Sequence, residues 1–289
     1  MTTYAITAAT GQLGRLAITD LLDRGIEPTE ITAIVRDRAK AQPLAESGVR
    51  VCVADFDDPE ALRGALEGTE QLLLISSGSF APGQRAVHHR NAIEAAAAAG
   101  VQRIVYTSLL RADTNTMPFG EDHRITEQIL REVGIPAVVL RNGWYAENFT
   151  DQLENYRRSG AFIGAAGTAR VAPVSRADLA AAAVSALLDR SLEATVYELA
   201  GPSMTFPELA EAIGNAAQMV LPYRDVTLDQ YRDGLVSAGL DENTAGFVTA
   251  LEAGIANGDL DSDSTDLERL LGRPVTDLNT ALTAIVGGN

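Results

Sequence analysis

Short apolar runs alternate with amphipathic stretches through the first half of this chain. The apolar runs predict strands at 3–7, 31–35, 49–54, 71–75, 103–107 and 137–140. The amphipathic stretches predict helices near 12–24, 38–46, 59–66, 84–99 and 122–133. The strands hold Val, Ile and Leu almost continuously, which indicates burial on both faces. This alternation predicts an α/β fold in which right-handed crossovers build a doubly wound parallel sheet.

The pattern loosens after residue 140, and helices there outnumber strands. Helices are predicted near 146–158, 177–188, 206–217, 228–238, 242–256 and 265–271. A glycine-rich turn is expected at 162–167 and a short strand at 196–199. We therefore expect a sheet domain over 1–141, to which segments near 172–200 return, and a smaller, mainly helical domain over 142–289.

The composition narrows the functional classes. Of the 289 residues, 46% are hydrophobic and 21% are charged, which is typical of a globular protein. The net charge of −16 argues against nucleic acid partners and anionic membrane surfaces. The single Cys52 fits a reducing compartment, and no basic stretch or long apolar run predicts a targeting or membrane segment. These features predict a soluble, cytoplasmic protein and are compatible with a homodimer.

The turn after the first predicted strand has the spacing of a dinucleotide-binding loop. It reads I-T-A-A-T-G-Q-L-G and has Ala8 where such loops begin with glycine. The N–H groups that open the following helix would face a pyrophosphate, although an ordinary strand-to-helix turn is the alternative. The predicted cofactor contacts are Thr10, Gly11, Gln12, Leu13 and Gly14. Because alanine tolerates a positive φ poorly, we expect an ordinary negative φ at Ala8.

The end of the second predicted strand indicates which cofactor is bound. Arg36 stands where NAD-binding proteins carry an acid, and Lys40 follows shortly after it. A guanidinium matches the oxygens of a 2′-phosphate, so the sequence predicts NADPH and a Rossmann-type NADP-binding domain over 1–141. Asp37 could instead repel that phosphate or reach a ribose hydroxyl, and a solvated basic helix start is the alternative for the whole segment.

The next two strands end in residues that suit the remaining parts of a dinucleotide. Asp55 and Phe56 would flank the adenine, one as a hydrogen-bond acceptor and one by stacking. Asp57 and Asp58 precede Pro59 and are expected to cap a helix. Ser76 and Ser77 leave the fourth strand toward the nicotinamide half, although they could form only a turn.

Several longer segments resemble the quinone oxidoreductases among the NmrA-like atypical short-chain dehydrogenases. The segments are 72–77, 106–110, 140–148, 162–167, 176–178 and 197–201, and the block Asn142–Asn148 is the most specific of them. The resemblance implies NADPH at the sheet edge and direct hydride transfer to quinones without a flavin. It also implies a substrate-binding role for 142–289. Ala8 and a lengthened loop at 78–83 depart from the family pattern.

The helix after the fifth strand lacks the Tyr-x-x-x-Lys pair of ordinary short-chain dehydrogenases. His123 and Glu127 share a face of this helix, either as a surface pair or with His123 as a dispensable proton donor, whose pKa is near neutral if unperturbed. Asn142 and Tyr145 are expected to shape the acceptor pocket, and Trp144 is expected in the core. The adjacent histidines His88 and His89 point to different helix faces, so no metal is predicted.

Two other functions fit the same residues. A redox-sensing NmrA-like regulator would bind NADP(H) and a protein partner without turnover. A reductase of azo or other dyes would use the same scaffold for hydride transfer. The block Asn142-Gly143-Trp144-Tyr145 favours an enzyme with a quinone-type pocket.

Overall fold

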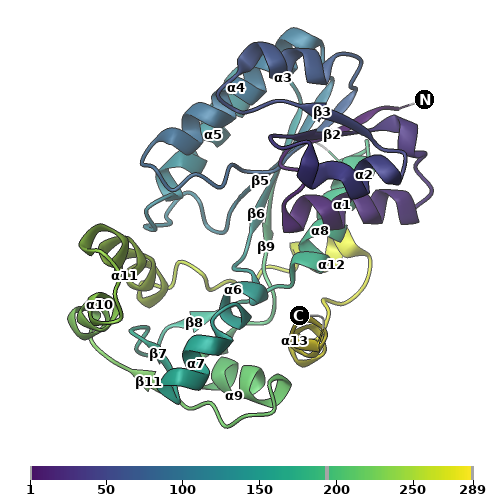
Figure 1. The fold of residues 1–289 in the computed structure, drawn as a ribbon. Coiled ribbons are helices and arrows are strands. Elements are labelled where there is room, and N and C mark those ends of the chain that lie inside the picture. The colour runs from purple at the N-terminus through teal and green to yellow at the C-terminus, as the bar shows by residue number, and fades with distance from the viewer. Residues whose placement is uncertain (1, 193–194, 288–289) are drawn as a thin grey trace.

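The computed structural model describes residues 2–192 and 195–287. Within them, a seven-stranded parallel sheet in the order β3-β2-β1-β4-β5-β6-β9 forms the larger lobe (Figure 1). Its strands are β1 (Tyr4–Ile6), β2 (Ile31–Val35), β3 (Arg50–Val53), β4 (Gln71–Leu74), β5 (Arg103–Leu109), β6 (Ala137–Asn142) and β9 (Val196–Leu199). The strand order reverses between β1 and β4, the position where sheets of this type bind ligands. The predicted doubly wound parallel sheet is confirmed.

Helices cover both faces of the sheet. One face carries α1 (Gln12–Asp23), α8 (Arg176–Leu188) and α12 (Asp266–Leu271), and the other carries α3 (Pro59–Leu66), α4 (Gln84–Ala99) and α5 (Gly120–Glu132) (Figure 1). A hydrophobic core lies on each face of the sheet, and successive strand residues point into opposite cores. Val105 packs under α8, and its neighbour Tyr106 packs under α4. The short elements η1 (Pro28–Glu30), η2 (Ala39–Ala41) and α2 (Gln42–Glu46) flank β2.

The smaller lobe lies below the sheet in Figure 1 and has its own aromatic core. Its helices are α6 (Ala146–Thr150), α7 (Leu153–Ser159), α9 (Phe206–Ala216), α10 (Leu228–Ser237), α11 (Glu242–Ala256) and α13 (Leu278–Gly287). Two short ribbons join them, one of β7 (Phe162–Gly164) with β11 (Tyr223–Asp225) and one of β8 (Arg170–Val171) with β10 (Met204–Thr205). Phe162 and Phe206 meet edge to face with centroids 5.8 Å apart, which fixes β7 on α9.

The structure corrects three local predictions. The helix expected at 38–46 is a 3-10 turn followed by α2, and the helix expected at 146–158 is broken into α6 and α7. At that break the Thr150 hydroxyl bonds back to the Glu147 carbonyl, an interaction that bends helices. The glycine-rich segment at 162–167 begins as β7 rather than as a turn, because β11 pairs with it from a distant part of the chain.

The large lobe takes segments from both halves of the sequence. Helix α8 packs on α1, and β9 pairs with β6 at the edge of the sheet. Helix α12 packs on the same face as α8. The expected boundary between two domains near residue 141 stays a prediction. No helix in the described residues is long and apolar enough to span a membrane.

Candidate active site

One continuous cleft of about 1890 Å³ runs along the carboxyl edge of the sheet and into the smaller lobe. Such a volume exceeds that of an ordinary small-molecule pocket and can hold two ligands together. Each candidate site residue from the sequence lines this cleft: Thr10, Gly11, Gln12, Leu13, Gly14, Arg36, Lys40, Asp55, Phe56, Ser76, Ser77, His123, Asn142 and Tyr145. The fold therefore brings together side chains from six separate segments.

The turn between β1 and α1 is built for close approach of a ligand to the backbone. Gly11 is the N-cap of α1, and no side chain caps the helix, so its first N–H groups are left for a ligand in the cleft. A Cβ on Gly14 would lie 2.6 Å from the carbonyl oxygen of Ala8, so only glycine lets the helix sit this close to the turn. An anionic group fits this cradle.

Ala8 adopts a left-handed conformation, with φ of 48°. The expectation of a negative φ is therefore wrong. The turn needs this conformation because the Ala8 carbonyl accepts a hydrogen bond from the Gly11 N–H at 2.9 Å. A side chain in this region is strained by roughly 1–2 kcal/mol, so this protein keeps the glycine-type turn at an energetic cost.

Arg36 and Lys40 lie exposed at the open end of the cleft, just beyond β2. Among the described residues neither side chain forms an ion pair. Asp37, which could have opposed a phosphate, uses its Oδ1 to accept a hydrogen bond from the Ala39 N–H at 2.9 Å. The positive charge of this end therefore remains available to an anionic ligand.

The residues after β3 divide between the cleft and local structure. Asp55 and Phe56 line the cleft, and the Phe56 ring stacks on His88 at 5.6 Å. Asp58 caps α3 by accepting the Ala61 N–H at 3.0 Å, as predicted. Asp57 does not cap that helix, because its carboxylate contacts His88 Nε2 at 3.1 Å instead.

A buried hydrogen-bond chain fixes the proton position on His89. The Ser77 N–H donates to His89 Nε2 at 2.8 Å. The Thr126 hydroxyl donates its one hydrogen to the Asp122 carbonyl at 2.7 Å, so it must accept from His89 Nδ1 at 2.8 Å. His89 is therefore neutral with its proton on Nδ1, and burial also lowers its pKa well below the usual value.

The same series of hydrogen bonds sets the protonation state of His123. Because His89 Nδ1 carries a proton that it donates to Thr126, the Tyr106 hydroxyl 3.3 Å away cannot donate to it, and donates instead to His123 Nδ1 at 2.7 Å. Burial and the nearby Arg85 guanidinium lower the pKa of His123 to about 3. His123 is therefore perturbed from the near-neutral pKa of a free histidine. His123 is neutral, and its remaining proton is on Nε2, at the wall of the cleft.

Glu127 does not form a surface pair with His123. Its carboxylate is buried, accepts the Ser108 hydroxyl at 2.7 Å and pairs with Arg141 at 2.7 Å. Arg141 also pairs with Asp113 at 2.7 Å and Glu198 at 2.9 Å. This ion network holds the carboxyl ends of β5 and β6 together beneath the cleft.

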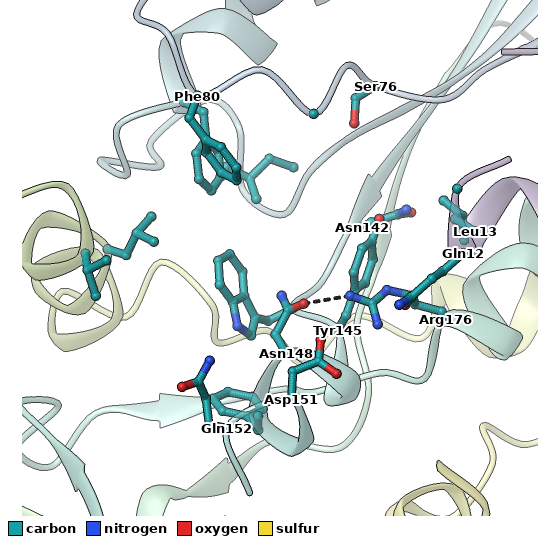
Figure 2. A pocket seen from close by; sticks show the side chains of 18 of the residues that line it. Gln12, Leu13, Ser76, Phe80, Asn142, Tyr145, Asn148, Asp151, Gln152 and Arg176 are labelled. Carbon is teal, nitrogen blue, oxygen red and sulfur yellow. Dashed lines mark hydrogen bonds between the residues drawn. The ribbon is translucent and has the colours of Figure 1, made fainter. Parts of the chain in front are cut away.

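Asn142, Tyr145 and Arg176 form the wall where the two lobes meet (Figure 2). The amide of Asn142 is buried beside the Tyr145 hydroxyl, and neither of its polar atoms forms a well-aligned hydrogen bond within the described residues. The Arg176 guanidinium stacks 4.7 Å over the Tyr145 ring and donates to Asn148 Oδ1 at 2.8 Å. An unpartnered buried amide beside a fixed aromatic ring is suited to a polar planar ligand.

The inner part of the cleft contains residues that the sequence analysis missed. Trp144, expected in the core, lines the cleft and stacks on Phe119 at 6.4 Å with planes 9° apart. The Phe80 ring, in the loop expected to be lengthened, meets the ring of Phe247 on α11 edge to face with centroids 5.5 Å apart. Figure 2 labels Phe80. Tyr156, Tyr231 and Glu252 line the far end. Glu252 had a signal in the sequence, since it falls on the apolar face of its helix, as the buried Ala245 does.

Comparisons with known proteins agree with this geometry. A family model described as NAD(P)H-binding matches residues 8–190. Quinone oxidoreductase 2 of Escherichia coli K12 is 42% identical over 286 residues, 99% of this chain and 99% of that protein. A solved structure of an NADPH-dependent quinone oxidoreductase from Escherichia coli with NADPH has a TM-score of 0.92 at 41% identity, covering 98% of this chain and 99% of that one. Citrobacter sp. triphenylmethane reductase with NADP(H) has a TM-score of 0.91 at 34% identity, covering 98% and 100%.

Proposed function

This chain belongs to the NAD(P)H-binding family, and from that premise we propose that it is an NADPH-dependent quinone oxidoreductase. The observation that carries the proposal is the continuous cleft, which runs from the N-terminus of α1 and the exposed Arg36 to the aromatic residues Phe119 and Trp144. The full-length similarity to a quinone oxidoreductase and to its NADPH-bound structure supports it.

The cofactor end of the cleft fits NADPH. The α1 N-terminus, with the close approach that Gly14 permits, would hold the pyrophosphate. Arg36 and Lys40 would bind the 2′-phosphate, and Asp55 with Phe56 would flank the adenine. The cofactor supplies a hydride when bound, and Ser76 and Ser77 lie where its nicotinamide half would face the acceptor.

The acceptor end would hold a planar ring between polar and aromatic side chains. Trp144 and Tyr145 offer flat surfaces, and the unpartnered Asn142 amide can hydrogen-bond a carbonyl oxygen of the acceptor. One hydride and one proton convert a quinone into a hydroquinone. The oxyanion formed on the way is a stabilised phenolate, so holding the reactants in near-attack geometry supplies most of the rate. The absence of a Tyr-x-x-x-Lys pair is compatible with this substrate class.

His123 acts in this proposal as a neutral hydrogen-bond donor rather than as an imidazolium acid. Its Nε2–H would stabilise the developing phenolate, while the Tyr106 hydroxyl keeps the proton off Nδ1. We expect His123→Ala to retain quinone reduction with a loss of about tenfold to a hundredfold. Simple aliphatic ketones, which form a basic alkoxide, should not be reduced at a comparable rate.

The test follows NADPH absorbance with purified protein that shows no flavin spectrum, with and without 1,4-benzoquinone. The proposal expects quinone-dependent oxidation above the rate in buffer, with no added flavin. NADPH binding without turnover would contradict it and would favour the redox-sensing regulator. A homodimer and a cytoplasmic location stay predictions.

Dye reduction is a second candidate. The triphenylmethane reductase at 34% identity, which the chain matches over 98% of its length, favours it. A triarylmethyl cation needs only a hydride to become a neutral product, so the same cleft residues would serve. Comparing kcat/KM for crystal violet and 1,4-benzoquinone ranks the two activities.

A further inference from the structure

The far end of the cleft is a chamber inside the smaller lobe, lined by Tyr156, Tyr231, Leu251, Glu252 and Ile255. We call it the tyrosine chamber. It is enclosed by α7, α10 and α11, away from the strand ends that would hold the cofactor. These five residues contribute one carboxyl and two hydroxyl groups and are otherwise aromatic or aliphatic, while polar residues of the same helices, such as Asn155 and Gln230, also line the cleft.

Glu252 is the unusual member of this chamber. Its side chain is only 6% exposed, and its Oε2 is fully buried without a hydrogen-bond partner in the described residues. Burial raises the pKa of Glu252 to about 7, with a smaller contribution from Asp225, although a hydrogen bond from the Ala165 backbone acts in the opposite direction. No ion pair in the described part of the chain includes this carboxyl.

The groups that face Glu252 do not neutralise it. Burial and the Glu252 carboxylate together raise the pKa of Tyr231. The same two causes raise the pKa values of Tyr156 and Tyr223. These phenols are therefore protonated at neutral pH. The Tyr156 and Tyr231 hydroxyls form no hydrogen bond with the described residues, and neither is among the fully buried polar atoms without a partner. Both therefore open to the cleft with free hydrogen-bonding capacity.

Two arginines that line the cleft, Arg158 and Arg224, do not pair with Glu252. Arg158 donates to Asn155 on its own helix, and Arg224 is exposed on β11. Neither forms an ion pair with Glu252. A buried carboxyl group that ionises near pH 7 and lacks a cation, set among aromatic rings, has the composition of a site for a positively charged nitrogen, which would favour the ionised form and also interact with the ring faces.

We propose that the tyrosine chamber binds a positively charged substituent of the electron acceptor, held by Glu252 and the rings of Tyr156 and Tyr231. This rests on the proposed function, because the acceptor ring would lie beside Trp144 and Tyr145 with its substituent extending into the chamber. The substituent takes no part in hydride transfer. Glu252 thereby selects cationic acceptors over neutral and anionic ones of the same shape.

A matched pair of quinones tests the proposal. One naphthoquinone carries a 2-(trimethylammonio)ethyl arm, and its neutral isostere carries a 3,3-dimethylbutyl arm. We expect the cationic quinone to have a kcat/KM about tenfold or more above its isostere, mostly through KM. Glu252→Gln, which keeps the shape and removes the charge, should bring this ratio close to one. The control Glu242→Gln removes one charge at the exposed start of the same helix and should leave the ratio unchanged.

The outcomes separate this proposal from the proposed function. A ratio near one in the natural protein, or a high ratio that survives in Glu252→Gln, overturns the role of the chamber. If neither quinone is turned over, the proposed function fails, and calorimetry with benzyltrimethylammonium then tests the chamber alone. Binding that weakens about tenfold or more in Glu252→Gln supports the chamber, whereas equal or absent binding refutes it.

Discussion

The two ends of the cleft are built from different kinds of groups. At the cofactor end, backbone N–H groups of α1 and the exposed Arg36 face the ligand, and few side chains there are buried and charged. At the acceptor end, buried titratable side chains such as His123 and Glu252 line the wall. The cofactor end should therefore tolerate pH change, whereas the acceptor end depends on desolvated groups whose protonation states are set by distant neighbours.

This contrast suggests a division of labour. A cofactor common to many reactions is held by geometry that a short local motif can encode. An acceptor is recognised by side chains that only the complete fold brings together. The following substitutions test whether the two ends behave as separately as their construction indicates.

The largest expected effect comes from the ion network that lies beneath both ends. Arg141→Met leaves the carboxylates of Asp113, Glu127 and Glu198 without their shared cation, and should lower the free energy of unfolding by about 3–5 kcal/mol. Urea unfolding measures the change. Arg63→Met, which removes only exposed pairs on α3, should cost less than about 1 kcal/mol. Equal losses in the two variants would mean that the buried network stabilises the fold no more than the exposed ion pairs do.

Glu252→Gln should change how stability depends on pH. The pKa of Glu252 is about 7 in the folded protein and 4.5 ordinarily, so the folded state binds this proton more tightly. The natural protein should lose about 3 kcal/mol of stability, relative to the variant, as pH rises from 4.5 through 7. Unfolding curves at pH 5 and pH 8 measure this difference. Parallel pH profiles for both proteins would show that Glu252 has an ordinary pKa.

Arg36→Ala tests the cofactor end alone. Loss of a charged hydrogen bond to the 2′-phosphate should weaken NADPH binding by about 1.5–3 kcal/mol and leave NADH nearly unaffected. Arg38→Ala, on the same segment but outside the cleft, is the matched control. Fluorescence titration with each nucleotide gives the constants. If Arg36→Ala weakens both cofactors equally, the side chain supports the fold rather than the phosphate.

The sequence predicts the cofactor end of the cleft better than the acceptor end, because the cofactor end is built from local motifs. Gly14 and Arg36 could be identified because their roles depend on spacing within one strand–turn–helix unit. The burial of Glu252 could be inferred from its place on the apolar face of its helix, but its role and that of Tyr231 could not, because their neighbours come from β7, α7 and α11. The protonation state of His123 could not be predicted for a related reason. Its pKa depends on burial under Tyr106 and on Arg85, which lie on other elements.

Ala8 was mispredicted because the usual preference of alanine conflicts with the demand of the turn. Ala8→Gly should relieve the left-handed strain and raise the free energy of unfolding by up to about 1 kcal/mol, after the entropy cost of glycine. Gln218→Gly, at a φ of 53° outside the cleft, should give a similar gain. NADPH affinity should stay the same in both variants. A tighter complex only in Ala8→Gly would mean that the methyl group crowds the pyrophosphate.

The most direct test of the proposed function asks whether a hydride passes from NADPH directly to the quinone. Flavin-free protein loaded with NADPH is mixed rapidly with 1,4-benzoquinone, and the decay of NADPH absorbance is compared for cofactor deuterated at one or the other C4 position. Direct transfer within a cleft that fixes the nicotinamide predicts that decay slows with one label and not with the other. Decay that matches the rate in buffer, and does not distinguish the two labels, would contradict it.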